Sequence, residues 1–306
     1  MALFKNTSSN LEGIKENPFK LEREIQRLFE NNLPLIMGLE LVKSEFSIKN
    51  KRIDTLGFDT QTNAFVIIEY KKDKNSSVVD QGFTYLNLML QNKADFVLEY
   101  NEGLKKSILR GDVDWSQTRV AFVSPGFTEN QREATNFKDI AIELWEVKQF
   151  ENGIVSINQI KKSNAAESIK DITGKAKDLV ELTREIKVYT EDDHLNSSKT
   201  RPEWVNELYF TLKERILNLG DVELKPNGKY ISFRNNSPFV DVIFYNSGLY
   251  TIINMKAGTL DDPGKLMKTF DGKGHWGNGD YFVTIDKKTD LDYVMFLINQ
   301  SFNKHE

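Results

Sequence analysis

The chain has 306 residues with a hydrophobic content of 39% and an aromatic content of 11%, enough for the cores of one large domain or two ordinary ones. It contains no cysteine, which excludes disulfides, thiolate catalysis and zinc–sulfur sites. With only three histidines, any metal must be held mainly by oxygen. The net charge of -4 does not indicate nucleic-acid binding, for which a local basic patch can nevertheless suffice.

The apolar runs of the chain bear on its localisation. The first residues, MALFKNTSSNLEG, lack the apolar core of a signal peptide. No run reaches the roughly 18 apolar residues that a membrane helix needs. We therefore expect a cytoplasmic protein with no membrane partner.

The first half of the sequence predicts a mixed α/β domain. An apolar stripe at helical spacing over residues 18–32 predicts the first helix, and further helices are expected over 77–91 and 127–137. Strands are expected over the ranges 39–48, 52–58, 65–68, 94–100, 119–124, 140–147 and 153–160. This order predicts a mixed sheet flanked by helices over residues 1–162.

The second half predicts a connector and a smaller domain. Residues 163–193 are polar and are interpreted as a helical connector, with a helix over 176–188. Residues 194–306 predict an α+β domain: a helix that begins at Pro202, short strands, a glycine-rich loop and a closing helix. The span 200–303 resembles a bacterial domain of unknown function that is sometimes labelled a predicted transport protein. We expect this domain to recognise nucleic acid or a partner, or to mediate dimerisation.

One predicted hairpin carries an unusual set of charges. Glu69 and Lys71 are two residues apart on the second strand and so point to one face, which Asp54 on the first strand can share. Two carboxylates placed this close destabilise each other, and a divalent cation removes the conflict by binding both. The alternative interpretation is a solvated hairpin edge with no ligand.

This pattern resembles the PD-(D/E)xK nuclease superfamily. Asp54 is followed by fourteen residues and then by Glu69-Tyr70-Lys71, although Ile53 stands where the superfamily often has proline. Gln81-x-x-x-Tyr85 on the following helix resembles the signature of the RecB-like branch, and the helix from Glu22 resembles the first helix of the family. Residues 20–100 are similar to the active-site region of NucS-type DNA endonucleases.

The resemblance implies a role for each residue of the set. Asp54 and Glu69 would bind Mg²⁺ or Mn²⁺ together with the carbonyl of Tyr70, Lys71 would position or activate water, and Gln81 would orient the lysine or a phosphate. Glu22 would complete the metal shell through water, or is simply a solvent-facing helix residue. Nucleic-acid contacts would come from Lys72, Lys74, Tyr85 and Trp276, for which solvated positions or ordinary packing are the alternatives.

The resemblance thus implies a metal-dependent hydrolase, an endonuclease of DNA in repair, restriction or phage defence. RNA stays open as a substrate, and a homodimer is expected if one site per chain cuts two strands. The alternative is a catalytically silent adaptor that binds nucleic acid or a protein. A transport accessory role would rest only on the label of the second domain.

Overall fold

A computed structural model describes residues 2–74, 78–137, 140–163, 187–270 and 278–305. The chain divides into two compact units, Met1–Val188 and Tyr189–Glu306, called unit 1 and unit 2 below. Most of the range expected to be a helical connector, and Trp276 as well, lie outside the described residues. None of the helices in the described ranges is long and apolar enough to cross a membrane.

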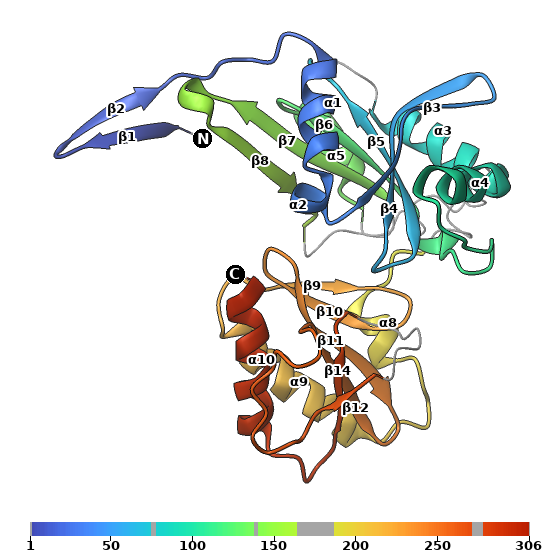
Figure 1. The fold of residues 1–306 in the computed structure, drawn as a ribbon, viewed down its shortest axis with the longest axis vertical. Helices are drawn as coiled ribbons and strands as arrows, with labels where there is room; N and C mark the ends of the chain where they lie inside the picture. Colours follow the sequence, from blue (N-terminus) through green and yellow to red (C-terminus); the bar gives the residue numbers. More distant parts are fainter. Residues whose placement is uncertain (1, 75–77, 138–139, 164–186, 271–277, 306) are drawn as a thin grey trace. The chain divides into compact units, whose positions relative to one another are not determined.

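Unit 1 is built on a six-stranded mixed sheet, the architecture expected from the sequence (Figure 1). The strands, which lie in chain order across the sheet, are β3 (Glu40–Ile48), β4 (Lys51–Asp59), β5 (Ala64–Tyr70), β6 (Arg119–Ser124), β7 (Ile142–Gln149) and β8 (Val155–Ile160). The pairs of β5 with β6 and of β6 with β7 are parallel, and the other pairs are antiparallel. Each parallel pair requires a crossover, and helices provide both.

Helices cover both faces of this sheet. α1 (Glu22–Asn31) and α2 (Leu33–Met37) pack on one face, where Ile25, Phe29 and Leu33 meet alternate residues of β5. α3 (Val78–Gln91) and α4 (Lys93–Leu104) cover the other face, and α5 (Glu129–Thr135) lies beside α3. Because both faces are covered, β5 is buried at all seven positions. Glu69, the one charged residue of β5, is therefore buried and needs specific partners for its carboxylate.

The turn between β4 and β5 fixes the register of the hairpin. Asp59 closes the turn by accepting the backbone N–H groups of Gln61 and Thr62. It also accepts a bond from the buried Arg119 side chain at 3.0 Å. Thr55 pairs with Ile68 across the two strands, so the next residue of each, Asp54 and Glu69, stand opposite one another.

One predicted strand is wrong. Residues 94–100 belong to α4, whose Phe96 and Tyr100, four residues apart, are buried against the sheet. A short run of aromatic and aliphatic residues suits either element, and packing on the sheet face decides for the helix. Two further elements are not predicted by the sequence pattern: α2, and a separate two-stranded sheet made by β1 (Leu3–Thr7) and β2 (Asn10–Ile14).

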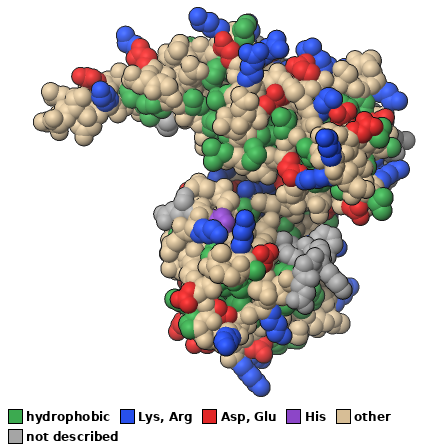
Figure 2. Space-filling model, viewed as in Figure 1, with side chains coloured by type: hydrophobic (Ala, Val, Ile, Leu, Met, Phe, Trp, Pro, Cys, Tyr) green, Lys and Arg blue, Asp and Glu red, His purple; other side chains and the backbone are tan. Residues whose placement is uncertain are grey.

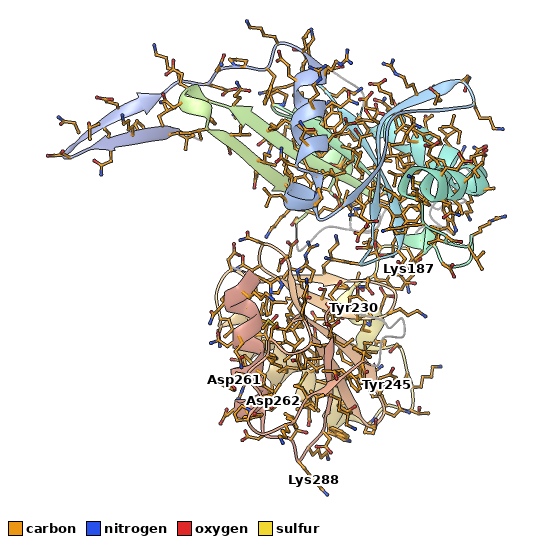
Figure 3. All side chains as sticks on the ribbon, viewed as in Figure 1. Lys187, Tyr230, Tyr245, Asp261, Asp262 and Lys288 are labelled. Atoms are coloured by element: carbon orange, nitrogen blue, oxygen red, sulfur yellow. The ribbon has the colours of Figure 1, made fainter. Side chains whose placement is uncertain are left out.

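Unit 2 is an antiparallel sheet packed against helices, as the predicted α+β domain requires. Its elements are α8 (Glu191–Leu195), α9 (Glu203–Leu217), β9 (Glu223–Pro226), β10 (Ile231–Arg234), β11 (Pro238–Tyr245), β12 (Gly248–Ile253), β13 (Lys268–Thr269), β14 (Tyr281–Ile285) and α10 (Leu291–His305). The strand order is β13-β14-β12-β11-β10-β9. α9 and α10 bury their apolar stripes against this sheet. Tyr245 ends β11 with an exposed ring (Figure 3).

Candidate active site

Glu69 of β5 lies on the side of the sheet that α3 covers, and Asp54 of β4 is hydrogen-bonded to it and to the residue that follows it. The Glu69 carboxylate accepts the backbone N–H of Asp54 at 3.2 Å. The Asp54 carboxylate accepts the backbone N–H of Tyr70 at 3.1 Å. Each acidic side chain therefore holds the strand that carries the other, which brings the two residues together.

Burial makes this pair electrostatically strained. Only 2% of Glu69 is exposed. Burial, followed by the charge of Asp54, raises the pKa of Glu69 to about 7. Burial also raises the pKa of Asp54, although the Tyr70 N–H and the Lys71 charge oppose the shift. Neither acid has the pKa of an exposed carboxyl group, because burial disfavours the charged form of both.

Lys71 and Gln81 converge on the same carboxylate. The Lys71 ammonium lies 3.7 Å from Glu69 Oε2, and its side chain is only 16% exposed. Gln81, in the first turns of α3, donates from Nε2 to the same Glu69 oxygen at 3.0 Å. Gly82 lets α3 approach this closely, because a Cβ there would lie 2.6 Å from Ile142 Cδ1. The four residues predicted to be catalytic are therefore brought together.

Tyr85 is a buried part of this arrangement. Its hydroxyl donates to the backbone carbonyl of Arg52 and accepts from Gln81, each at 3.2 Å. Burial, followed by the charge of Glu69, raises the pKa of Tyr85 to about 12. The ring belongs to the core between the sheet and α3. These contacts support a positioning role for Tyr85, and its contact with nucleic acid stays a prediction.

The remaining predicted residues lie around the pair. Glu22, at the start of α1, accepts the backbone N–H of Lys72 at 3.2 Å, and its charge contributes to the raised pKa of Asp54. The Tyr70 ring is fully buried on the opposite face, so only its backbone carbonyl is available as a ligand. Lys72 is exposed, and the exposed Lys74 side chain lies over Gly126, where a Cβ would come within 2.7 Å of its Cε.

Sequence reasoning missed Gln26 as a site residue. Its buried side chain donates from Nε2 to the Asp54 carbonyl at 2.9 Å and also reaches Glu30 and Ser44. Glu30 in turn accepts the Thr55 hydroxyl at 2.5 Å. The signal was present, because Glu22, Gln26 and Glu30 form a polar row at a spacing of four beside the apolar stripe of α1. Gln26 and Glu30 of this row hold β4 through the Asp54 carbonyl and the Thr55 hydroxyl.

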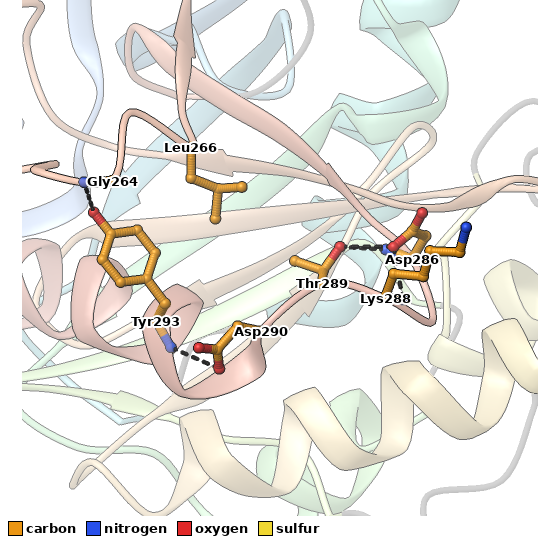
Figure 4. Close-up of a pocket in the computed structure, with 7 residues that line it drawn as sticks. All are labelled: Gly264, Leu266, Asp286, Lys288, Thr289, Asp290 and Tyr293. Carbon is orange, nitrogen blue, oxygen red and sulfur yellow. Dashed lines mark hydrogen bonds between the residues drawn. The ribbon is translucent and has the colours of Figure 1, made fainter.

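Unit 2 contains a pocket of about 390 Å³ that includes none of the predicted site residues (Figure 4). Its lining comes from the loop before β13, the loop after β14 and the start of α10. Asp286 accepts the Lys288 N–H and the Thr289 hydroxyl, and Asp290 accepts two N–H groups at the start of α10. Tyr293 donates to Asp262, which Figure 3 places beside Asp261. These polar groups hold the loops, and they do not indicate a reaction.

A comparison with known proteins finds a relative that matches nearly the whole chain. It is 50% identical over 302 residues to an uncharacterized protein of Haemophilus influenzae, which covers 98% of this chain and 99% of that protein. The chain belongs to the same family as that protein. Within this family, residues 191–305 match the model of a domain of unknown function, DUF5655. In this chain the matched domain coincides with most of unit 2, and unit 1 precedes it.

Three solved structures share a weak likeness with this family member. A repair endonuclease from Pyrococcus abyssi is 20% identical with a TM-score of 0.25, and the match covers 43% of this chain and 49% of that one. EndoMS bound to double-stranded DNA is 14% identical with a TM-score of 0.25, covering 48% and 64%. EndoMS in its apo form is 15% identical with a TM-score of 0.29, covering 47% and 65%. The chain thus spans less than two thirds of each, and likeness of this degree transfers neither activity nor substrate.

Proposed function

We propose that the protein is a metal-dependent endonuclease that hydrolyses DNA phosphodiester bonds. The observation that carries the proposal is the convergence of Asp54, Glu69, Lys71 and Gln81 at one end of β5, with Glu69 contacted by the other three. Two acids with raised pKa, a lysine and an amide at one point are costly to bury for structure alone. The resemblance of the same residues to the PD-(D/E)xK superfamily supports the proposal.

The donor set suits Mg²⁺ or Mn²⁺. Both ions prefer carboxylate and carbonyl oxygens, and the chain offers Asp54, Glu69 and the backbone carbonyl of Tyr70. No cluster of three or more His, Asp or Glu side chains that could hold a metal occurs in the described ranges, so water would supply part of the shell. A bound ion of this kind polarises a phosphoryl oxygen and lowers the pKa of water.

The protein side chains supply position and charge. Lys71, restrained beside Glu69, is placed to hold an attacking water or to stabilise charge on a phosphate oxygen. Gln81 fixes the Glu69 carboxylate and is itself fixed by Tyr85. Glu22 orients the chain after β5 through the Lys72 N–H. These contacts, from α1, α3 and the end of β5, support a site that would hold its side chains in place before a phosphate binds.

A second candidate is an adaptor that retains the fold and binds nucleic acid or protein without cleavage. The net charge of -4 favours this alternative. Figure 2 also shows Lys and Arg interspersed with Asp and Glu over the visible face of unit 1, without a field of one sign. Weak electrostatic attraction is expected to lower affinity for DNA, because most non-specific affinity comes from phosphate neutralisation.

A cleavage assay separates the two candidates. Single-stranded, double-stranded, mismatched and branched DNA, and RNA, would be incubated with the full chain in Mg²⁺ and in Mn²⁺. We expect metal-dependent cleavage of a DNA form that Glu69→Gln reduces by about 100-fold or more. Glu99→Gln is the matched control, because Glu99 is a partly buried glutamate of unit 1 that lies on α4 and pairs with Lys43. Cleavage that Glu69→Gln leaves unchanged would assign the activity elsewhere, and binding without cleavage would favour the adaptor.

A further inference from the structure

Strands β1 and β2 form an arm, residues 3–14, that stands apart from the rest of unit 1. The two strands pair only with each other in the described structure. Residues 15–17 join the base of the arm to the turn after β7, where Glu16 bridges Phe150 and Glu151 donates to the Lys15 carbonyl. Figure 1 shows the arm projecting beyond this turn and away from β8.

One face of the arm is apolar and open. Phe4 lies opposite Gly13 and Leu11 opposite Asn6, so both large side chains lie on the same face. Phe4 is 55% exposed and Leu11 is 66% exposed. The other face carries the opposed pair Lys5 and Glu12, with the half-buried pair Leu3 and Ile14 at the base of the arm. An isolated two-stranded hairpin is marginally stable in water, so an arm with this composition requires something to cover it.

Among the described residues, the two edge strands of the unit 1 sheet, β3 and β8, differ in how well they discourage pairing with another strand. Edge strand β3 carries Glu40, Lys43 and Glu45, and its register shifts between Leu41 and Lys43, both of which discourage pairing with another chain. Edge strand β8, with the sequence VSINQI, carries no charge and pairs with β7 in continuous register. Ile154 and Val155 at its start are each 38% exposed.

We propose that the protein forms a symmetric dimer in which the arm of each copy pairs with the β8 edge of the other. The lengths agree, because each arm strand has five residues and β8 has six. Val155 shares a sheet face with Ile157, which packs on the core below α1, so an added strand would place Phe4 and Leu11 beside an existing apolar face.

Symmetry favours a second copy over an unrelated partner. In its described residues the same chain carries both an arm with exposed apolar side chains and an uncharged edge strand, and the arm points away from its own β8. Around a two-fold axis, the arm of each copy covers the β8 edge of the other. The assembly then stops at two chains, because no arm or β8 edge remains to bind a third copy. The inference does not depend on the proposed nuclease function.

The oligomeric state of the full chain is the first test. Sedimentation equilibrium is expected to show a dimer for the wild type. The double variant Phe4→Ser with Leu11→Ser should raise the dimer dissociation constant by about 100-fold, because two buried apolar side chains are lost. The matched control is Lys5→Ser with Glu12→Ser, on the other face of the same strands, which should leave the constant within a few-fold. A monomeric wild type, or equal effects of the two double variants, overturns the proposal.

Cross-linking tests the contact itself and does not depend on the stability of a variant. The chain has no cysteine, so introduced thiols are the only ones present. Leu11→Cys combined with Val155→Cys, and Phe4→Cys combined with Val155→Cys, should form covalent dimers on mild oxidation. Leu11→Cys combined with Lys43→Cys, on the opposite edge strand β3, should not. Monomeric chains with an internal disulfide, or no covalent dimer from either pair, overturn the proposal.

Discussion

The carboxylate of Glu69 accepts the backbone N–H of Asp54 at 3.2 Å, while the Asp54 carboxylate accepts the N–H of the residue after Glu69 at 3.1 Å. Each acid is therefore fixed by the strand that carries the other, and neither can turn away without giving up a hydrogen bond. Burial raises the pKa of both, and the charge of Asp54 raises that of Glu69 further. The fold thus holds two carboxylates where a divalent cation would relieve their repulsion.

Metal binding is expected to stabilise the folded protein. Because the ion would bind the assembled pair and not the unfolded chain, Mg²⁺ or Mn²⁺ at about 100 times its dissociation constant should add about 2.7 kcal/mol to the free energy of unfolding. Thermal unfolding in the presence of EDTA and of each ion measures this shift. Asp54→Asn should abolish it, and Glu99→Gln on α4 should retain it. An equal shift for wild type and Asp54→Asn would place the ion at another site.

Lys71 is expected to act in turnover. Lys71→Met should lower the cleavage rate by about 100- to 10,000-fold, the range observed when a positioned proton-transfer or charge-stabilising group is removed. Single-turnover kinetics at saturating DNA measure the step directly. Lys105→Met, which removes an exposed lysine at the end of α4, is the matched control. If both variants lose the same modest factor, Lys71 contributes only general charge.

Tyr85 can be tested for the two roles left open by its sequence position. Tyr85→Phe removes one hydroxyl that bonds to Arg52 and Gln81 and keeps the buried ring. We expect the free energy of unfolding to fall by about 1 kcal/mol, the usual net value of such hydrogen bonds. Affinity for DNA, measured by fluorescence anisotropy with a catalytically inactive background, should not change. A loss of affinity without a loss of stability would instead indicate direct contact with phosphate.

The local pattern of the site could be read from the sequence, since two-residue alternation places Glu69 and Lys71 on one face and helical spacing places Gln81 with Tyr85. The pairing of Asp54 with Glu69 needed the register, which the Asp59 turn sets. The support from Gln26 was out of reach because it depends on a side chain of α1 meeting a backbone carbonyl of β4.

The errors in the predicted fold have a common cause. The range 94–100 is short, aromatic and aliphatic, and its helical state depends on a sheet face that local spacing does not describe. The sequence of the arm shows only a weak apolar pattern. Phe4 and Leu11 are exposed and pack on no core in the described part of the chain, so no regular spacing of apolar residues is required there. The long helices α9 and α10 could be predicted because their apolar residues recur at helical spacing over 15 residues, and these residues form the buried face.

In unit 2, Asp241 is a fully buried acid on β11. It accepts the backbone N–H of Asn278 at 2.6 Å and the Asn278 side-chain amide at 3.0 Å. Burial raises the pKa of Asp241 from 3.8 to about 6, although these hydrogen bonds oppose the shift. The folded state therefore binds a proton between about pH 4 and pH 6 that the unfolded chain has already released.

This acid is expected to make the protein less stable as the pH rises. Because the folded pKa lies above the unfolded value, the stabilising contribution is complete below about pH 4 and is lost through about pH 6. The loss amounts to about 3 kcal/mol by the usual conversion of a two-unit shift. Asp241→Asn, which cannot ionise, should lack this step, so its unfolding free energy relative to wild type should rise between pH 4 and pH 6.5. Urea unfolding across this range measures the difference, with the exposed Asp221→Asn as control, and a difference that does not vary with pH would contradict the shift.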